Sequence, residues 1–396
     1  MNSRIQKKVI LLVDDMVPAT GGGIASWAIQ LTHVLIRKGC EVTVFSHRKM
    51  KPDSVKLDPS VKIIYVPGRD WNKTRSFFMT IALIPCLFNS GRYHIIAATW
   101  MHAEGLAALR WLFKFSLICF AHGTDISKAL YSNRRNRLNR VLRKTDVFIP
   151  VSEFHNLLIG KEFPDLSLKG AVIHNGIDTR HFKPADRAAE SKIQLPFKPD
   201  DAFILLSVGR VIQAKGYELV IRALPEIKKA IPNVHYLIAG QQDEPEYSHL
   251  KQLSHELGVQ TCVHFLSKIG YQDLPELYHA AQLFVLTSKP IYEPFYQEDN
   301  FPMVLLEAAA CGLPSIGTYC GGIPEIIEEG VTGFLVPVDN HHSLAGKVIT
   351  LHENEPLRQQ MGINARERIL RFFDKEKVME PLWAYLGEDQ EKDQAD

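Results

Sequence analysis

The chain has 396 residues, of which 46% are hydrophobic and 23% are charged, and its formal net charge is +2. This composition excludes a disordered or fibrous chain, and the length fits two domains better than one. Its six cysteines form no CxxC pair, so we interpret them as reduced core residues and expect a cytoplasmic protein.

The N-terminal segment predicts a buried strand followed by a helix. The apolar run Val9–Val13 is too short for a signal peptide, and it ends at Asp14 and Asp15. Three glycines, Gly21–Gly23, follow as a turn between this strand and the next helix. We therefore expect the chain to begin with a βα unit whose turn is flexible enough to approach a ligand.

A second apolar stretch, FFMTIALIPCLF at residues 77–88, is twelve residues long and contains Pro85. A helix needs about 20 apolar residues to span a bilayer. The stretch therefore predicts a buried or interfacial helix.

Charge is divided unevenly along the chain. Residues 1–180 contain 26 Lys and Arg against 13 Asp and Glu, a net charge of +13, and the remainder carries −11. Residues 134–144, RRNRLNRVLRK, hold six basic residues on a predicted amphipathic helix. Two interpretations remain open: contact with an anionic membrane or lipid-phosphate acceptor, or a solvated face and attraction between the two halves.

Runs of branched residues alternate with helical patterns from Val9 to Ile173, which predicts parallel βαβ units in a doubly wound sheet. After the polar stretch 178–201 the pattern repeats, with runs that read FILLSV, VHYLIAG, CVHFL, LFVLT and PSIGT. The sequence therefore predicts two α/β domains, each with a Rossmann-like parallel sheet, facing across a cleft.

The second series opens with a strand and a cationic loop. Residues 202–216 read AFILLSVGRVIQAKG and place Gly209, Arg210 and Lys215 just after the apolar run. Each charge pair at 4 Å contributes about 4 kcal/mol at an effective dielectric constant of 20. Two cations at a strand end can therefore hold a diphosphate.

Within residues 299–325, Asp299 and Glu307 lie eight positions apart around a short predicted helix over 303–311. The backbone N–H groups near Met303 and Val304 then face outward, where a diphosphate is stabilised. Glu307 lies about one turn into the helix and could accept hydrogen bonds from ribose hydroxyls. Asp299 precedes the helix and could reach a sugar.

These segments together resemble retaining glycosyltransferase family 4. The resemblance is carried by HGTDI at 122–126, NGID at 175–178, GR and KG at 209–216, the acid pair around FPMVLLEA at 301–308, and GGIPE at 321–325. The first strand, the glycines and the following helix also match, so the resemblance covers nearly the whole chain.

The resemblance implies the GT-B fold, with residues 1–180 as an acceptor domain and 181–371 as a donor domain. It also implies that a C-terminal helix, 372–390, crosses back to the first domain, and the amphipathic segment 371–386 suits this docking.

Roles for individual residues follow from the same match. The implied catalytic set is His122, Arg210, Lys215, Asp299 and Glu307. The implied donor-binding set is Gly22, Gly23, Arg210, Lys215, Asp299, Phe301, Met303, Val304 and Glu307. The family usually has Glu where this chain has Asp299. Because Glu298 is adjacent, either carboxylate could fill that role.

The resemblance implies transfer from a nucleoside-diphosphate sugar to a glycolipid, capsule, lipopolysaccharide or other polysaccharide acceptor, with retention at the sugar carbon. No Asp-x-Asp, GxGxxG or GxxxxGK motif occurs, so we expect neither a metal nor a dinucleotide cofactor. We expect no nucleic-acid partner, and a cytoplasmic enzyme that can associate peripherally with the membrane. A nucleotide-sugar epimerase of the same fold and an inactive sugar-binding protein are the alternatives.

Overall fold

The computed structural model describes residues 7–16, 18–47, 57–67, 75–88, 93–166, 170–185, 195–197, 202–267, 269–293 and 296–387, without the side chains of 18–22 and 75. It comprises two compact units. The first consists of Met1–Gly176 with Lys375–Asp396, and the second is Ile177–Asp374. The sequence places the corresponding boundaries at 180 and 371.

The first unit is built on a six-stranded parallel sheet with the order β3-β2-β1-β4-β5-β6. Its strands are β1 (Lys8–Val13), β2 (Glu41–Ser46), β3 (Lys62–Tyr65), β4 (Tyr93–Ala97), β5 (Ser116–Ala121) and β6 (Val147–Pro150). Its helices are α1 (Pro18–Arg37), α2 (Arg75–Leu87), α3 (Trp100–Leu109), α4 (Thr124–Leu130), α5 (Arg135–Lys144), α6 (Glu153–Glu162), α14 (Lys375–Val378) and α15 (Leu382–Tyr385).

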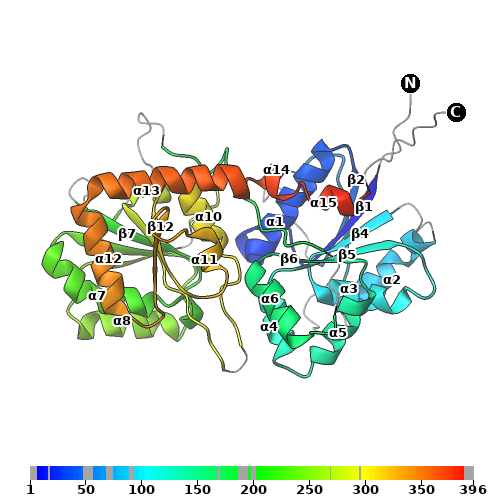
Figure 1. The fold of residues 1–396 in the computed structure, drawn as a ribbon, viewed down its shortest axis with the longest axis horizontal. Helices are drawn as coiled ribbons and strands as arrows, with labels where there is room; N and C mark the ends of the chain where they lie inside the picture. Colours follow the sequence, from blue (N-terminus) through cyan, green and yellow to red (C-terminus); the bar gives the residue numbers. More distant parts are fainter. Residues whose placement is uncertain are drawn as a thin grey trace. The chain divides into compact units, whose positions relative to one another are not determined.

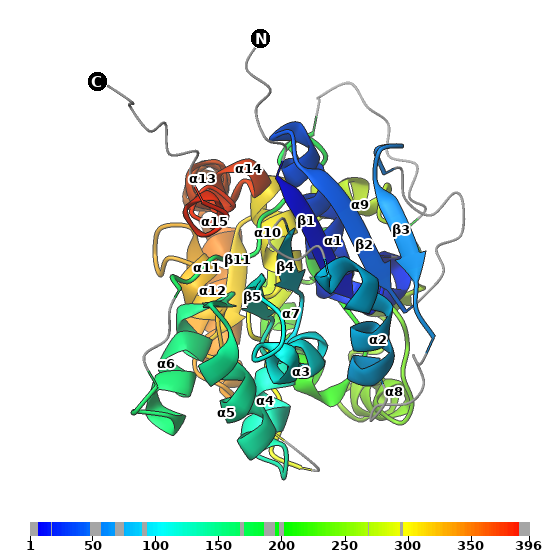
Figure 2. The ribbon, with the colours of Figure 1, turned by 90° about the vertical axis from the view of Figure 1, so that its right-hand side faces the viewer.

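Helices cover both faces of this sheet (Figure 2). Ile10 and Leu12 of β1 share a core with residues of α2 and α3, such as Leu83 and Trp100. Helix α1 packs against β1 and β2, and its Trp27 is 1% exposed. Because both faces are buried, the strands are nearly continuous apolar runs rather than alternating ones.

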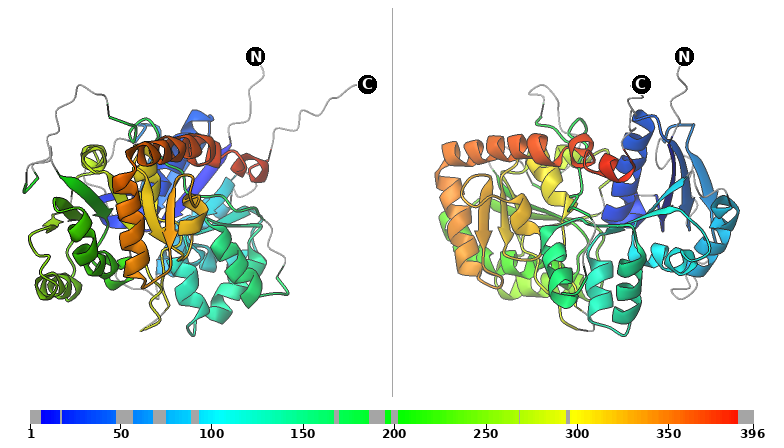
Figure 3. Two further views of the ribbon diagram at one scale, coloured as in Figure 1. Left: turned by 60° about the vertical axis from the view of Figure 1, so that its left-hand side comes forward. Right: turned by 45° about the vertical axis from the view of Figure 1, so that its right-hand side comes forward.

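The second unit repeats the design, with the sheet order β12-β11-β10-β7-β8-β9. Its strands are β7 (Phe203–Val208), β8 (Val234–Ala239), β9 (Val263–Leu266), β10 (Leu283–Leu286), β11 (Ser315–Thr318) and β12 (Gly333–Val336). Its helical elements are η2 (Gln213–Lys215), α7 (Tyr217–Ala230), α8 (Glu246–Glu256), α9 (Leu274–Ala280), α10 (Met303–Ala310), α11 (Ile323–Ile326), α12 (His341–Glu353), α13 (Glu355–Arg368) and the π-turn η3 (Ile369–Phe373). Helices α7 and α12 lie side by side (Figures 1 and 3).

Both sheets have the strand order of doubly wound nucleotide-binding folds. The order reverses between β1 and β4 in the first unit and between β7 and β10 in the second. In such sheets ligands bind beyond the carboxyl ends of the strands at the reversal. The predicted α/β fold class is confirmed, and each unit has one such point.

The C-terminal segment differs from the single helix expected over 372–390. It forms the π-turn, then α14 and α15. The first break is at Asp374, whose backbone is extended with ψ of 135°, and the second is at Pro381, which lacks the N–H that a continuous helix needs. Both short helices belong to the first unit, where Glu376 pairs with Arg37 and Lys38 lies 5.7 Å from the Trp383 ring. Residues 388–390 of the predicted helix lie outside the described residues.

The two connections between the units run beside each other, and this explains the NGID segment. A Cβ atom on Gly176 would lie 2.6 Å from the Cα of Lys375, so only glycine fits. Ile177 donates its N–H to the carbonyl of Phe373 at 2.9 Å, and the Thr179 hydroxyl donates to Asp374 at 2.6 Å. The motif therefore fixes the two connecting segments against each other where they pass between the units.

All six cysteines are unpaired, and all but the half-buried Cys86 are buried, as the sequence predicts. Among the described residues no helix has the length and apolar character that crossing a membrane requires.

Candidate functional site

The cationic loop after β7 is shaped by glycines. A Cβ atom on Gly209 would lie 3.0 Å from the Tyr217 hydroxyl and 3.5 Å from Cε of Lys215, so the backbone here stays close to the lysine. The Tyr217 hydroxyl donates to the carbonyl of Arg210 at 3.2 Å. The Arg210 side chain is exposed, and no residue within the described ranges bonds its guanidinium. It is therefore available to an anion.

Lys215 and Asp299 form the central ion pair of this region. The lysine Nζ donates to both carboxylate oxygens of Asp299 at 2.8 Å, and the side chains are only 18% and 19% exposed. The Ser288 hydroxyl, just beyond β10, donates to the same carboxylate. Residues after β7 and β10 thus meet at the point where the strand order reverses.

Gly216 fixes the position of Lys215. Its φ is +65°, and a Cβ atom would lie 1.9 Å from the carbonyl oxygen of Thr287. The Thr287 hydroxyl donates to the Gly216 carbonyl at 2.7 Å. The backbone of the turn at Lys215 is therefore in close contact with the residue that follows β10.

Replacing Gly216 with alanine should lower the melting temperature far more than replacing Gly258. The two glycines have φ values of +65° and +67°, but a Cβ atom on Gly258 would meet nothing within 4 Å. The left-handed backbone alone costs about 1 to 2 kcal/mol for a side-chain-bearing residue, and only Gly216→Ala adds a backbone clash. Equal melting temperatures for the two variants would contradict this packing.

The structure separates the two candidate carboxylates. Asp299 faces Lys215, whereas Glu298 is 7% exposed, is hydrogen-bonded by Tyr296 and has one oxygen, Oε1, without a hydrogen bond from any described residue. Burial raises the pKa of Glu298 to about 7. The structure therefore places Asp299 beside the predicted phosphate-binding lysine, and its contact with a sugar stays a prediction.

The GGIPE segment supports the loop that holds Asp299. A Cβ atom on Gly321 would lie 1.8 Å from the Asp299 carbonyl oxygen, and one on Gly322 would lie 1.9 Å from that of Asn300. Gly322 also donates its N–H to the Asp299 carbonyl at 3.1 Å. Both glycines are thus needed for close backbone contact.

Helix α10 begins where the sequence places it. Phe301 and Met303 are 6% and 9% exposed, Val304 is half-buried, and within the described part of the chain no side chain caps the first turn. The first N–H groups of a helix have no partner inside it and attract anions. The helix start therefore retains donors for a phosphate.

Glu307 lies inside α10 with 8% of its surface exposed. The Tyr278 hydroxyl of α9 donates to its Oε2 at 2.6 Å. Burial raises the pKa of Glu307 to about 7, and the Tyr278 hydrogen bond opposes that rise. Near neutral pH the group is therefore close to its midpoint.

We expect nucleotide affinity to increase as the pH rises through about 7, because the ionised Glu307 is the stronger acceptor for ribose hydroxyls. Tyr278→Phe removes a hydrogen bond to the carboxylate and should move the midpoint upward by roughly half to one pH unit. The matched control is Tyr236→Phe, whose hydroxyl is buried against Ser207 at 2.9 Å. Calorimetric titration between about pH 5.5 and 8.5 measures the effect.

The same ionisation affects folding in the opposite direction. Because the folded-state pKa of Glu307 lies above its ordinary value, the folded protein binds this proton more tightly, and the contribution of Glu307 to stability falls as the pH rises towards 7. A pH-dependent affinity with the same midpoint in Glu307→Gln would contradict the assignment to Glu307 rather than Glu298.

In the first unit, His122 follows β5 and is packed between aromatic rings. Its ring lies 4.6 Å from that of Trp27 in an edge contact and 6.4 Å from that of Phe120. Burial lowers its pKa to about 3, so the imidazole is neutral at pH 7. Its buried Nε2 has no hydrogen-bond partner among the described residues, and its contact with the donor sugar stays a prediction.

Asp125, three residues later, accepts the N–H of Gly123 at 3.0 Å. Burial raises its pKa to about 6. The HGTDI segment thus places a neutral imidazole and a carboxyl of raised pKa at the end of one strand.

The predicted glycine turn is not a separate loop. Helix α1 begins at Pro18, so Gly22 and Gly23 lie within its first turns. In a helix, N–H groups beyond the first four bond to the preceding turn. The phosphate contact predicted for the Gly23 N–H would require this turn to open, and it stays a prediction.

The basic segment 134–144 forms α5, with Leu138, Val141 and Leu142 buried. Three of its arginines form ion pairs inside the first unit: Arg135 with Glu162, Arg137 with Glu104 and Arg143 with Asp165. The positive charge available to a partner is therefore smaller than the sequence suggests.

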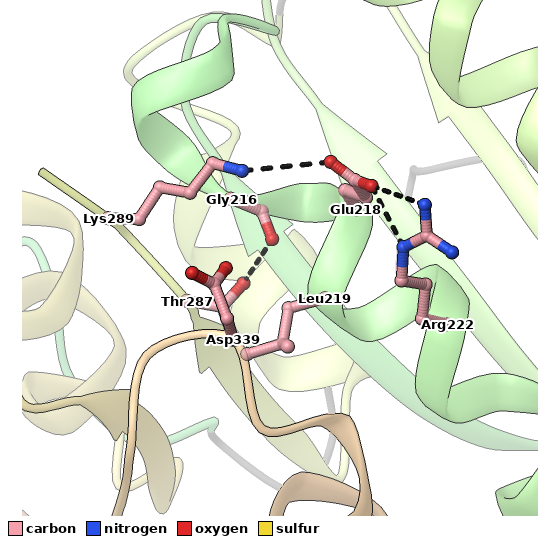
Figure 4. A pocket seen from close by; sticks show the side chains of 7 residues that line it. All are labelled: Gly216, Glu218, Leu219, Arg222, Thr287, Lys289 and Asp339. Atoms are coloured by element: carbon pink, nitrogen blue, oxygen red, sulfur yellow. Dashed lines mark hydrogen bonds and ion pairs between the residues drawn. The ribbon is translucent and has the colours of Figure 1, made fainter. Parts of the chain in front are cut away.

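A small cavity of about 150 Å³ lies beside the first turn of α7 (Figure 4). It is lined by Gly216, Glu218, Leu219, Arg222, Thr287, Lys289 and Asp339. Glu218 lies between two cations in Figure 4, bonded to Arg222 at 2.8 Å and 3.7 Å from Lys289. None of the predicted site residues lines this cavity, and its two cations are both paired with Glu218.

Sequence reasoning missed three supporting hydroxyls, those of Tyr217, Ser288 and Tyr278. Tyr278 lies 29 positions from Glu307, and Ser288 lies 11 from Asp299. They have no motif of their own, and only the fold brings them to their carboxylates.

Comparison with known proteins covers both units. A model described as Glycosyltransferase Family 4 matches residues 21–181, and one described as Glycosyl transferases group 1 matches residues 189–368. The chain is 30% identical over 272 residues to an N-acetyl-alpha-D-glucosaminyl L-malate synthase of Bacillus anthracis, which covers 67% of this chain and 66% of that protein.

Solved structures have the same fold. Sucrose-phosphate synthase from Thermosynechococcus elongatus has a TM-score of 0.78 and 24% identity, over 94% of this chain and 96% of that one. Anabaena HepE in complex with UDP and glucose has a TM-score of 0.76 and 21% identity, over 95% and 98% of the two chains. At these identities the likeness establishes the fold alone.

Proposed function

Since the chain belongs to the GT-B glycosyltransferases of the family 4 and group 1 type, we propose that it is a retaining enzyme that uses a nucleoside-diphosphate sugar. The supporting observation is the region after β7 and β10, where Lys215 is held by Asp299 and the Arg210 guanidinium is exposed. The acceptor is a hydroxyl of a glycolipid, polysaccharide or related glycoconjugate.

Arg210 and Lys215 neutralise the diphosphate in this proposal, together with the N–H groups that begin α10. Asp299 orients Lys215 and accepts hydrogen bonds from the donor sugar. Glu307 accepts hydrogen bonds from the ribose. The two cations supply the charge that a divalent metal provides in other transferases, so the proposed transfer needs no metal.

Transfer occurs on one face of the sugar. The bond from the anomeric carbon to the phosphate oxygen breaks as the bond to the acceptor oxygen forms on the same side, and the acceptor proton passes to the departing phosphate. Neutral His122 serves as a hydrogen-bonding group near the sugar. Arg210 and Lys215 are then the main electrostatic catalysts.

A donor panel tests the function. UDP is the first nucleotide to try, because HepE of like fold was crystallised with UDP and glucose, and GDP- and ADP-sugars complete the panel. A bound donor should raise the melting temperature, because a donor concentration 100 times its Kd adds about 2.7 kcal/mol to the free energy of unfolding. L-malate belongs among the acceptors, given the name of the 30% identical relative.

The decisive readout is release of nucleoside diphosphate that depends on the acceptor, with NMR of the product's anomeric carbon. Retained configuration without added metal supports the proposal. Epimerised donor in the absence of acceptor would identify an isomerase instead. Binding without turnover of any donor and acceptor pair would favour the inactive sugar-binding protein.

Peripheral contact with an anionic membrane is a further part of the proposal. The exposed face of α2 and the turn after α3 carry large apolar side chains, with Phe77 60%, Phe88 75% and Trp111 80% exposed. The Phe88 ring packs on that of Phe113 at 5.4 Å, which places the end of α2 near this turn. Lipid would cover these rings, and the positive first unit would favour anionic head groups.

Vesicles containing anionic lipid should therefore retain the protein on sedimentation, and Phe88→Ser with Trp111→Ser should weaken binding by at least about 10-fold, since each ring loses roughly 1.5 kcal/mol or more of burial. Tyr292→Ser is the control, because Tyr292 is 71% exposed in the second unit. If the Phe88→Ser, Trp111→Ser protein bound vesicles as well as Tyr292→Ser does, these rings would not be the membrane-binding surface. If the native protein did not bind vesicles, membrane contact would be removed from the proposal.

A further inference from the structure

A cluster of two imidazoles and a carboxylate lies in the first unit, apart from every residue assigned above. Asp14 follows β1, His47 follows β2, and His102 lies in the first turn of α3, just after β4. Strands β2, β1 and β4 are neighbours in the sheet, so their carboxyl ends meet at one edge. The cluster therefore occupies the point of strand reversal, where open α/β sheets hold ligands.

The spacing of the three side chains suits a tetrahedral metal ion. His102 Nε2 lies 3.3 Å from Asp14 Oδ1, and zinc bonds of about 2.0 to 2.1 Å place tetrahedral ligands roughly 3.4 Å apart. One ligand atom from each of the three residues lies within 4.8 Å of the other two. Only a small inward movement of His47 would complete three ligands.

The protonation of His47 is fixed by its surroundings. Its Nδ1 lies 3.0 Å from the carbonyl oxygen of Val66 and 3.1 Å from that of Pro67. Two carbonyls can only accept, so Nδ1 carries the proton and Nε2 keeps its lone pair. His47 is 8% exposed, and its buried Nε2 has no hydrogen-bond partner among the described residues.

His102 is oriented in the same manner. Its ring is 3% exposed, and its Nδ1 lies 2.9 Å from the Thr99 hydroxyl, leaving Nε2 directed at Asp14. Metal-binding histidines characteristically donate their second ring N–H to a carbonyl, carboxylate or other acceptor, which fixes the tautomer. Both imidazoles here have such a partner.

We propose that Asp14, His47 and His102 bind one divalent cation of the zinc class, with the fourth position open to water or a ligand. Two imidazoles and a carboxylate with an open position form a ligand set typical of such ions. A hydrogen bond from His102 to Asp14 alone would leave the buried Nε2 of His47 without a function, whereas the metal uses it. No residue proposed to hold the diphosphate belongs to the cluster, so this site does not depend on the proposed function.

Direct binding to the full-length protein tests the site. After treatment with EDTA and its removal, the protein is titrated with Co²⁺, whose visible absorption reports tetrahedral coordination, and with Zn²⁺ by calorimetry. We expect one tightly bound ion per chain. His47→Gln and Asp14→Asn should weaken binding by about 100-fold or more, and Thr99→Val, which removes only a supporting hydroxyl, by about 10-fold.

Two controls make the test specific. His94→Gln alters a half-buried histidine of β4 outside the cluster and should bind as the native protein does. In the second unit, His235 Nδ1 lies 2.9 Å from His264 Nε2, so this pair of ring nitrogens could also bind a metal ion. The titration is therefore repeated in His235→Gln. Circular dichroism confirms that each variant is folded.

Loss of the bound ion in His47→Gln, with retention in His94→Gln and His235→Gln, supports the site. Binding that survives His47→Gln, or that disappears with His235→Gln, would overturn it. Absence of any bound ion at micromolar Co²⁺ or Zn²⁺ in the native protein would also overturn it. Should His47→Gln fail to fold, the milder Thr99→Val variant is used instead. If the cluster binds a metal, Thr99→Val should bind the ion more weakly than the native protein. If the cluster is purely structural, neither protein should bind an ion.

Discussion

Lys215→Ala should reduce sugar transfer by about 100- to 1000-fold, the usual effect of removing one donor that stabilises developing negative charge. The lysine donates to both oxygens of Asp299 and is 18% exposed, so it is held in place before the donor arrives. Its loss would also leave Asp299 without its cation. We therefore expect a loss of about 2 kcal/mol in unfolding free energy alongside the loss of rate.

The two effects of Lys215→Ala can be separated. Lys215→Arg keeps a cation and should restore stability more than turnover, because the guanidinium is longer and planar. Lys347→Ala is the matched control: this lysine also lies in the second unit, 3.8 Å from Glu329 and 4.0 Å from the Phe334 ring. Turnover is measured on folded protein below each melting temperature. A native rate in Lys215→Ala would refute the role of the lysine.

Arg210→Ala should lower transfer by a similar factor, about 100-fold or more, with little change in melting temperature. The Arg210 side chain is exposed and no described residue bonds it, while its carbonyl still accepts from Tyr217 in the variant. The folded protein loses no hydrogen bond or ion pair between this side chain and a described residue, so most of the effect should fall on the reaction. Steady-state rates together with thermal melting measure both quantities.

The comparison for Arg210→Ala is Arg222→Ala on α7. Arg222 lies in the same unit and is bonded to Glu218, so its loss should affect stability slightly and turnover hardly at all. If both variants turned over at equal rates, the diphosphate would have to be held elsewhere. A large fall in melting temperature for Arg210→Ala would show that the side chain has a structural contact.

Much of the fold could be predicted because its signals are local. Runs such as FILLSV are buried on both faces, and this alone predicts parallel strands covered by helices. Gly209 and Gly216 follow β7, and the bounds of α10 follow from Pro302 and Gly312. These features depend on neighbours within a few residues.

What the sequence could not supply depends on contacts between distant segments. The hydroxyls of Tyr278 and Ser288 reach Glu307 and Asp299 only in the folded unit. The ion pairs of α5 join residues 22 to 33 positions apart, so its basic pattern overstated the free charge. The cluster of Asp14, His47 and His102 likewise spans three strand ends and matches no spacing rule.

The glycines near the N-terminus show that local helix propensity can also mislead a prediction from sequence. Gly21–Gly23 have the low helix propensity typical of a turn, yet α1 extends through them to Pro18. A proline at the first helical position is preorganised for helix, and the apolar packing of the rest of α1 outweighs the glycine cost. Propensity read over three residues therefore gave the wrong start for this helix.

The most direct test is a calorimetric titration, in EDTA, of whichever of UDP, GDP and ADP stabilises the native protein most. We expect the native protein to bind this nucleotide without metal. Arg210→Ala and Lys215→Ala should each weaken binding by at least about 10-fold through loss of a charge pair, and Arg222→Ala should not. Binding of equal strength in the native protein, Arg210→Ala and Lys215→Ala would contradict this expectation.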